Sequence, residues 1–224
     1  QIIEILVHRV DGEAAAAEVS DQGTPCHYVQ ADVGNADDCA RLMAEAIGRL
    51  GHVNALCNSA ATTDRGTLLD TTLEMWQRQM DINARGPFLL MQAVVRHLLE
   101  RGAPGTIVNV LSQSAHCGQS FLVPYSASKA TLANLTKNVA QSFRRQRIRC
   151  NGVMAGWMDT PGEHAIQQRV HGAPDDWLAK AEAGPENAQA FAELGHQYLE
   201  LDDLPNALRA YKRAVGLAPA QGIY

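Results

Sequence analysis

Short apolar runs alternate along this chain with longer segments of helical periodicity. The apolar runs lie at residues 2–7, 27–30, 55–58, 105–110 and 148–153, and the helical segments lie at 12–22, 35–50, 80–100 and 124–144. Strands separated by helices of this length indicate a parallel sheet covered by helices on both faces. We therefore predict an α/β fold with a doubly wound parallel sheet, in which Asn35 is the N-cap of the second helix.

A tyrosine and a lysine stand four residues apart in the segment Tyr125-Ser126-Ala127-Ser128-Lys129, and Ser112 precedes them. On a helix, residues four apart project from the same face, one turn from each other. A phenol exchanges protons poorly at neutral pH because its pKa is about 10, and a nearby ammonium lowers that pKa by favouring the phenolate. A serine hydroxyl can hold a substrate oxygen alongside. These three groups suit the interconversion of an alcohol and a carbonyl.

The order of these residues matters more than the pair itself, because Tyr-x-x-x-Lys is also common on solvated helices. Residues 106–111 have the pattern of a buried strand, and Ser112 follows at its carboxyl end. In open α/β sheets, ligands bind at that end of the strands. The succession of strand, serine, loop and Tyr-x-x-x-Lys therefore favours a catalytic role over a solvated one.

Several segments resemble the short-chain dehydrogenase/reductase family at the family's spacing. They are Cys57 to Ala61, Asp81 to Gly86 and Ile148 to Pro161, together with the Ser, Tyr and Lys motif, and the resemblance runs from about residue 1 to about residue 184. Departures from the family's pattern stand at Ser59, Ala61 and Ala155. The resemblance implies a Rossmann-like sheet and an NAD(P)-dependent oxidoreductase that acts on an alcohol, a ketone or a sugar-like polyol.

The resemblance also implies a role for each catalytic residue. Tyr125 is expected to be the general acid and base, and Ser112 is expected to anchor the substrate oxygen. Lys129 is expected to lower the pKa of the tyrosine and to hydrogen-bond the nicotinamide ribose. Asn83 is expected to hold a water that connects Lys129 to solvent.

The family's cofactor-binding positions can be carried over in the same way. Asp32 and Val33 are expected at the adenine, and Asn58 is expected both to lie along the cofactor and to tie neighbouring strands together. The remaining expected cofactor contacts are Ala60, Ala61, Tyr125, Lys129, Met158 and Thr160. Asp32 can equally be read as a helix cap or turn residue, and Thr160 as a turn residue before Pro161.

The end of the first apolar run indicates which cofactor is preferred. The family usually places an acidic residue there to bind the ribose 2′-hydroxyl of NAD, whereas an arginine can meet the 2′-phosphate of NADP. His8 and Arg9 occupy this place. A planar guanidinium suits a phosphate, so NADP(H) is favoured over NAD(H). The alternative is that Arg9 is a solvated charge at the end of a strand.

One expected motif has no counterpart in the sequence. The family opens with a strand and a glycine-rich turn whose amides hold the cofactor pyrophosphate, but no Gly-x-x-x-Gly-x-Gly occurs here. Residues 2–7 instead resemble the family's second strand, and the family's last strand is also missing. We therefore expect a sheet truncated at both ends, in which the strands at 2–7 and 55–58 either close up or leave exposed edges.

Residues 186–223 resemble a single tetratricopeptide repeat, which predicts a C-terminal α-helical hairpin in a second domain at 185–224. The positions that match the repeat's signature are Phe191, Leu194, Gly195, Tyr198, Ala207, Tyr211, Ala214 and Pro219. An ordinary amphipathic helix pair is the alternative. About three such repeats are usually needed for stability, so a lone hairpin is expected to pack on the first domain or on a protein partner.

Composition narrows the possible partners and location. The net charge of −5 argues against nucleic acid and anionic membranes as partners, and no apolar run is long enough to span a membrane. Five cysteines without a C-x-x-C pair are expected to be reduced and mostly buried, as in a cytoplasmic protein. The eight histidines show no metal-ligand spacing, so no metal is predicted.

Two functions remain open at this point. The first is an oxidoreductase of low or absent turnover, because the proton-transfer residues are present and the glycine-rich turn is not. The second is a non-catalytic remnant that binds another protein through the hairpin.

Helices at 80–100 and 124–144 resemble those of the family's dimer core, which implies a homodimer. The substrate pocket is expected between the loops at 113–123 and 161–180, with Ser114, His116 and Trp177 as candidate lining residues.

Overall fold

The computed structural model describes residues 2–4, 9–117, 119–156 and 168. The chain divides into two compact units, residues 1–156 and 157–224. All described residues except Gln168 belong to the first unit. The predicted helical hairpin and the predicted domain boundary near residue 185 lie outside the described residues.

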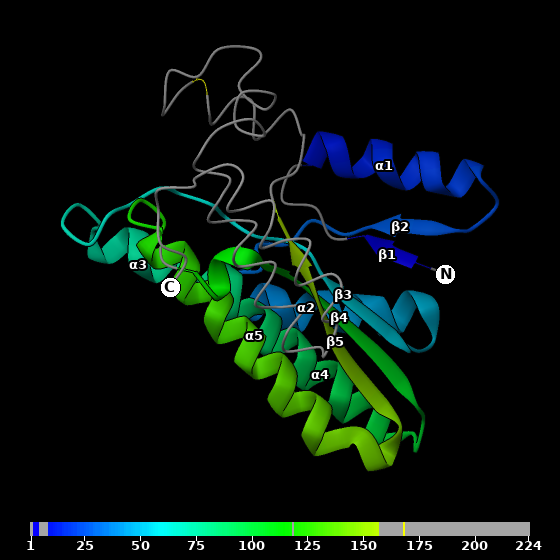
Figure 1. Cartoon of the computed structure of the whole chain (residues 1–224). Coiled ribbons are helices and arrows are strands. Elements are labelled where there is room, and N and C mark those ends of the chain that lie inside the picture. Colours follow the sequence, from blue (N-terminus) through cyan, green and yellow to red (C-terminus); the bar gives the residue numbers. More distant parts are fainter. Residues whose placement is uncertain (1, 5–8, 118, 157–167, 169–224) are drawn as a thin grey trace, which may run out of the picture. The chain divides into compact units, whose positions relative to one another are not determined.

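The described strands are all parallel and form two separate sheets (Figure 1). In the first sheet, β1 (Ile2–Glu4) pairs with β2 (Cys26–Tyr28). In the second, β4 (Gly105–Ser112) lies between β3 (Ala55–Asn58) and β5 (Ile148–Ala155). The predicted parallel α/β architecture is confirmed, and β1 and β3 leave edges rather than closing up, because they do not pair with each other in the described part of the chain.

Helices connect these strands in the predicted order. The α-helices are α1 (Arg9–Asp21), α2 (Ala36–Leu50), α3 (Leu73–Met80), α4 (Gly86–Glu100) and α5 (Val123–Phe143). Three short helical segments join them, namely the π-helix η1 (Asp81–Arg85) and the 3-10 helices η2 (Gln113–Ala115) and η3 (Arg144–Gln146). Asn35 is the N-cap of α2 as predicted, since its side chain accepts hydrogen bonds from the amides of Asp37 and Asp38 at 2.8 and 3.2 Å.

Three boundaries differ from the prediction in ways that affect the site. The first helix begins at Arg9 instead of Gly12, so Arg9 opens α1 rather than ending a strand. The helix predicted at 80–100 begins earlier, at Leu73, because Thr72 caps it there by accepting from the amide of Met75 at 3.2 Å. The π-helix η1 interrupts it between α3 and α4. The strand predicted at 105–110 extends to Ser112.

The main hydrophobic core lies between one face of the β3–β5 sheet and helices α2, α4 and α5 (Figure 1). Ile107 of β4, Ile148 of β5 and Leu98 of α4 are at most 1% exposed in it. The opposite face of this sheet is exposed at Ala55, Cys57 and Arg149. Cover on both faces was predicted, and the described residues show it on one face.

None of the described helices combines the length and the apolar character that a membrane crossing requires.

Candidate active site

Ser112 ends β4 and lies in a short chain of hydrogen bonds. It is 9% exposed, its Oγ donates to Ser114 Oγ at 3.1 Å, and it accepts from the amide of Ser114 at 3.2 Å. Ser114 Oγ in turn donates to Gln119 Oε1 at 3.2 Å. The carboxyl end of the central strand of this sheet therefore presents a hydroxyl whose proton can turn to another acceptor.

Tyr125 and Lys129 lie in the first half of α5, one turn apart as the spacing predicted. The Lys129 Nζ atom is 5.8 Å from the centroid of the Tyr125 ring, and it donates to the carbonyl oxygen of Val110 at 2.8 Å. Val110 is two residues before Ser112 in β4, so this bond ties the lysine to the strand end that carries the serine. The structure thus connects the predicted Ser, Tyr and Lys residues through one strand and one helix.

Burial changes the protonation of Lys129. The side chain is 2% exposed, and desolvation of its charged form lowers the pKa of the ammonium from 10.5 to about 8. The described surroundings give it one hydrogen bond, to Val110, and an ammonium has three donors. At neutral pH the lysine is mostly charged and has donors left for a ligand.

Asn83 lies in the π-helix η1 and is fully buried, with an exposed fraction of 0%. Its Oδ1 accepts from the amide of Thr62 at 2.8 Å, and its Nδ2 donates to the carbonyl of Thr62 at 2.9 Å. The same Nδ2 lies 3.0 Å from Ser128 Oγ in α5. Thr62 and Ser128 use the hydrogen-bonding groups of the Asn83 side chain. The predicted contact between Asn83 and a water stays a prediction, and the Asn83 backbone would have to make it.

Asn58 ties strands together as predicted. Its Nδ2 donates to Asn109 Oδ1 at 2.8 Å, across the pairing of β3 with β4, and Asn109 Nδ2 donates to Thr136 Oγ1 of α5 at 2.8 Å. Asn109 is 0% exposed, and sequence reasoning missed it. A polar residue within an otherwise apolar run was the signal that could have revealed it.

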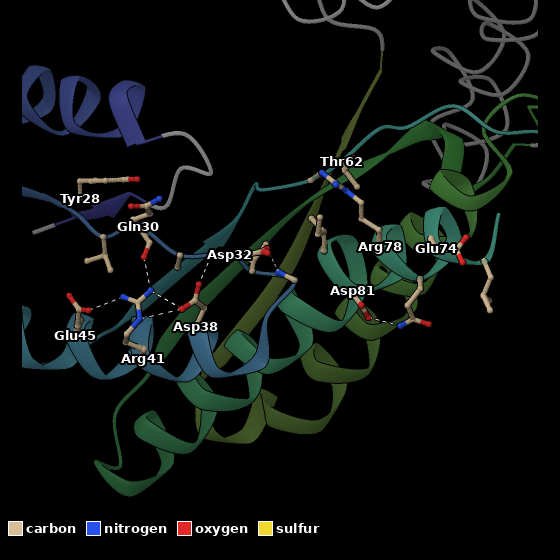
Figure 2. A pocket seen from close by; sticks show the side chains of 18 of the residues that line it. Tyr28, Gln30, Asp32, Asp38, Arg41, Glu45, Thr62, Glu74, Arg78 and Asp81 are labelled. Carbon is tan, nitrogen blue, oxygen red and sulfur yellow. Dashed lines mark hydrogen bonds and ion pairs between the residues drawn. The ribbon is translucent and has the colours of Figure 1, made fainter. Parts of the chain in front are cut away.

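A pocket of about 1390 Å³ opens beside the carboxyl end of β2 (Figure 2). Asp32, Val33 and Ala61, three of the predicted cofactor residues, line it together with Thr62 and side chains of α2 and α3. Asp32 Oδ1 accepts from the amide of Gly34 at 2.8 Å, as a turn residue does, while the side chain remains exposed. The turn reading therefore describes the position of Asp32, and its contact with the adenine stays a prediction.

Arg41 of α2 lies at the side of this pocket and was not among the predicted residues (Figure 2). It donates to Asp38 Oδ1 and Glu45 Oε1, both at 2.9 Å, and to the carbonyl of Gln30 at 2.7 Å. The amide of Asp32 and then Arg41 hold the pKa of Asp38 below its usual value. Acidic and basic residues three and four apart in the α2 sequence were the signal for this cluster.

The other predicted site residues fall into two groups. Ala60 is half-buried against a small cluster around Val33, and His116 is exposed. Met158, Thr160 and Trp177 lie outside the described residues, as does most of the predicted loop at 161–180. Of the predicted cofactor contacts, Asp32, Val33 and Ala61 share one pocket, whereas Tyr125 and Lys129 are at the start of α5.

A dinucleotide fits the described residues at its two ends. The pocket beside β2 offers the adenine positions, and Lys129 and Ser112 offer donors at the other end. The part of the chain that the structure describes contains no glycine-rich turn for the pyrophosphate. Within those same ranges, no three His, Cys, Asp or Glu side chains are grouped so that they could hold a metal ion.

The burial predicted for most of the cysteines is confirmed for Cys26, Cys39 and Cys150. Cys57 is exposed on β3, and Cys117 is half-buried. Burial raises the pKa of the Cys150 thiol to about 11.

Comparisons with known proteins agree with this arrangement. The family described as enoyl-(acyl carrier protein) reductase matches residues 3–196. A dehydrogenase/reductase SDR family member 4 of Oryctolagus cuniculus is 37% identical over 161 residues, which cover 71% of this chain and 60% of that protein. A sorbitol dehydrogenase of Cereibacter sphaeroides is 31% identical over 160 residues, which cover 71% of this chain and 62% of the relative.

Solved structures show the same fold. A gluconate 5-dehydrogenase from Burkholderia cenocepacia J2315, in complex with NADP and tartrate, has a TM-score of 0.70 and 27% identity. That match covers 82% of this chain and 70% of the other. The chain spans less than two thirds of the length of both curated relatives.

Proposed function

The chain belongs to the short-chain dehydrogenase/reductase family, and from that premise we propose that it is an NAD(P)-dependent oxidoreductase that interconverts an alcohol and a ketone. The observation that carries this proposal is the Lys129 ammonium, which is buried, bonded to the strand that ends in Ser112, and 5.8 Å from the Tyr125 ring. A buried charge is unfavourable for folding when no carboxylate pairs with it, and none of the described residues forms an ion pair with Lys129. Its position next to a tyrosine is therefore more readily explained by chemistry than by stability.

Each side chain then has a defined part in the proton transfer. For alcohol oxidation, Tyr125 as phenolate takes the hydroxyl proton of the substrate, and the positive charge of Lys129 stabilises that phenolate. The Ser112 hydroxyl redirects its hydrogen bond from Ser114 to the substrate oxygen, and this bond holds the substrate oxygen in place. In ketone reduction, Tyr125 returns the proton to the oxygen. A bound nicotinamide supplies or accepts the hydride.

The proposed cofactor preference is NADP(H), and it depends on Arg9. The described lining of the pocket beside β2 has five carboxylates, from Asp32, Asp38, Glu45, Glu74 and Asp81, and three guanidiniums, from Arg41, Arg49 and Arg78. Arg41 and Arg49 are already paired with carboxylates there, and Arg78 Nε lies 3.8 Å from Asp64 Oδ2. A 2′-phosphate would therefore need Arg9, at the start of α1, as its cation.

We propose a polyol or hydroxy acid as the substrate class. Two similar proteins are a sorbitol dehydrogenase and a gluconate 5-dehydrogenase. Such substrates carry several hydroxyls, and the linked hydroxyls of Ser112 and Ser114 could bind adjacent ones. A homodimer through α4 and α5 is part of the same proposal.

A second candidate is a non-catalytic protein that binds a partner through residues 185–224. It is favoured by the absence of a Gly-x-x-x-Gly-x-Gly motif from the sequence. Each charge-assisted hydrogen bond lost from a pyrophosphate is worth about 1.5–3 kcal/mol, so several would weaken cofactor binding by orders of magnitude. Low or absent turnover is accordingly our expectation for this 224-residue chain.

Cofactor titration separates the two candidates. NADPH and NADH fluorescence would be followed while the purified chain is added, and reduction of ketose sugars would then be assayed with the tighter cofactor. Saturable binding with turnover that Tyr125→Phe and Ser112→Ala abolish supports the oxidoreductase. Ser126→Ala is the matched control, because Ser126 Oγ is buried on the same helix and has no hydrogen-bond partner among the described residues. Absence of binding at millimolar cofactor supports the second candidate.

A further inference from the structure

A second pocket lies at the amino-terminal ends of β4 and β5, at the other end of the strands from Ser112. It has a volume of about 440 Å³ and is lined by the turns that precede β4 and β5 and by Asn54, just before β3. β4 runs from Gly105 to Ser112, so at about 3.3 Å per residue it separates this pocket from the candidate active site by roughly 23 Å. The pocket is therefore independent of the proposed oxidoreductase chemistry.

Three guanidinium groups line this pocket, and they come from Arg101, Arg147 and Arg149. All three side chains are exposed, and none forms an ion pair with any residue in the described ranges. Arg149 Nη2 donates to Thr106 Oγ1 at 2.8 Å. Arg144 and Arg145 lie in η3, between the end of α5 and Arg147, so positive charge gathers here in a chain whose net charge is −5.

Two of these arginines have ordinary structural explanations. Arg101 follows the last residue of α4, where the helix dipole favours a cation. Arg149 is bonded to Thr106 across the strand pair. The case for a ligand therefore depends on Arg147 and on the convergence of three guanidiniums, without carboxylate partners in the described ranges, on one pocket.

Arg147 has a backbone conformation that an arginine rarely adopts. Its φ is +59°, in the left-handed region, and among the described residues it is the only non-glycine residue with a positive φ. Glycine adopts this conformation freely, whereas a residue with a Cβ atom does so at a free-energy cost. Arg147 is also the C-cap of η3, where its amide donates to the carbonyl of Arg144 at 3.1 Å, and left-handed caps of this kind are usually glycine. At this position the arginine adds a guanidinium to the pocket at a cost in free energy that glycine would not have.

The backbone around the pocket holds the three turns together. The amide of Gly105 donates to the carbonyl of Arg147 at 3.3 Å, and the amide of Thr106 donates to the carbonyl of Asn54 at 2.9 Å. The turns that carry the guanidiniums are thus fixed to one another before any ligand arrives. Such preorganisation lowers the entropy lost on binding.

The geometry points to a binding site for a compact oligophosphate, held by Arg101, Arg147 and Arg149. Guanidinium groups match phosphate oxygens with two parallel hydrogen bonds each, and three of them suit a di- or triphosphate group better than a single phosphate. The described lining has no aromatic side chain on which a nucleobase could stack. The site recognises the phosphates and not a base.

Isothermal titration calorimetry of the whole chain with inorganic pyrophosphate, at constant ionic strength, tests this proposal. We expect saturable binding, at least about 10-fold weaker binding of orthophosphate, and ADP binding no tighter than pyrophosphate. Arg147→Gly should weaken pyrophosphate binding by about 10- to 100-fold. Without pyrophosphate, that variant should melt no lower than the wild type, because glycine accepts the left-handed φ.

Lys137→Gln is the matched control, because it removes one positive charge from an exposed position on α5 outside the pocket. Arg149→Gln provides a second variant in case Arg147→Gly folds poorly. Unchanged affinity in either arginine variant that folds, or an equal loss in Lys137→Gln, would overturn the proposal. The proposal would also be overturned if the chain bound an RNA oligonucleotide or an anionic vesicle but not pyrophosphate. Binding of ADP about 10-fold more tightly than pyrophosphate would overturn it as well. Tyr125→Phe should keep pyrophosphate binding, which separates this site from the proposed active site.

Discussion

The buried ammonium of Lys129 predicts a specific dependence of stability on pH. Its pKa is lowered from 10.5 to about 8 because the side chain is 2% exposed and desolvated. Between pH 8 and pH 10.5 the folded chain has lost this proton, while the unfolded chain still binds it. Unfolding then takes up a proton, so the free energy of unfolding rises with pH across this window.

The magnitude follows from the same shift. At about 1.36 kcal/mol for each pH unit, the fall from 10.5 to about 8 corresponds to roughly 3 kcal/mol over the whole window. Below pH 8 the folded state carries the full penalty of the buried charge. Lys129→Met removes the charge, although it leaves the carbonyl of Val110 without this donor.

Urea unfolding of the wild type and of Lys129→Met, at intervals from pH 7 to pH 10, measures this effect. The stability of the wild type relative to Lys129→Met should rise with pH by up to roughly 3 kcal/mol. Lys137→Met, at an exposed position on the same helix, is the control and should follow the wild type at every pH. A constant difference between the wild type and Lys129→Met across this range would refute the argument that burial governs the lysine.

Three other predictions concern packing and reactivity. Asn83→Ala should lower the free energy of unfolding, measured in urea, by about 3 kcal/mol, because the backbone of Thr62 and the Ser128 hydroxyl lose a buried partner. A loss below about 1 kcal/mol would contradict this expectation. Gly86→Ala should destabilise by about 1–3 kcal/mol because its Cβ would collide with the carbonyl oxygen of Val33, whereas Gly48→Ala, in open space on α2, should stabilise by about 0.5–1 kcal/mol; equal effects in thermal unfolding would be inconsistent with the packing. At pH 8, iodoacetamide should modify exposed Cys57 well before Cys150, whose pKa burial raises to about 11, and mass spectrometry showing equal rates would argue against this burial.

Parts of the site that depend on neighbours along the chain could be predicted from the sequence. Helical periodicity placed Tyr125 and Lys129 one turn apart on α5, and the apolar run before Ser112 placed that serine at the end of β4. The cap at Asn35 was predictable for the same reason, since a side chain there reaches amides only two and three residues away. Strand and helix periods are properties of short stretches, so sequence is enough to recognise them.

Other parts depend on segments that are distant in the sequence. The side chain of Asn83 is fixed by the backbone of Thr62, twenty-one residues earlier, and no local pattern predicted that contact. The separation of β1–β2 from β3–β5 was left open, because strand pairing is a contact between remote segments. The pocket at Arg101 and Arg147 was not predicted at all, since no local pattern brings those two turns together.

Local sequence patterns are enough to predict the α/β class, the order of the elements and the candidate proton-transfer residues. The charge and the hydrogen bonds of those residues depend on tertiary packing. Lys129 has a lowered pKa because burial desolvates it, and Arg147 caps η3 in a left-handed conformation while its carbonyl accepts from the amide of Gly105 at the start of β4. Periodicity is a property of residues that are close together in the sequence. Burial of a side chain, and the meeting of side chains from different turns, arise only when distant residues pack together.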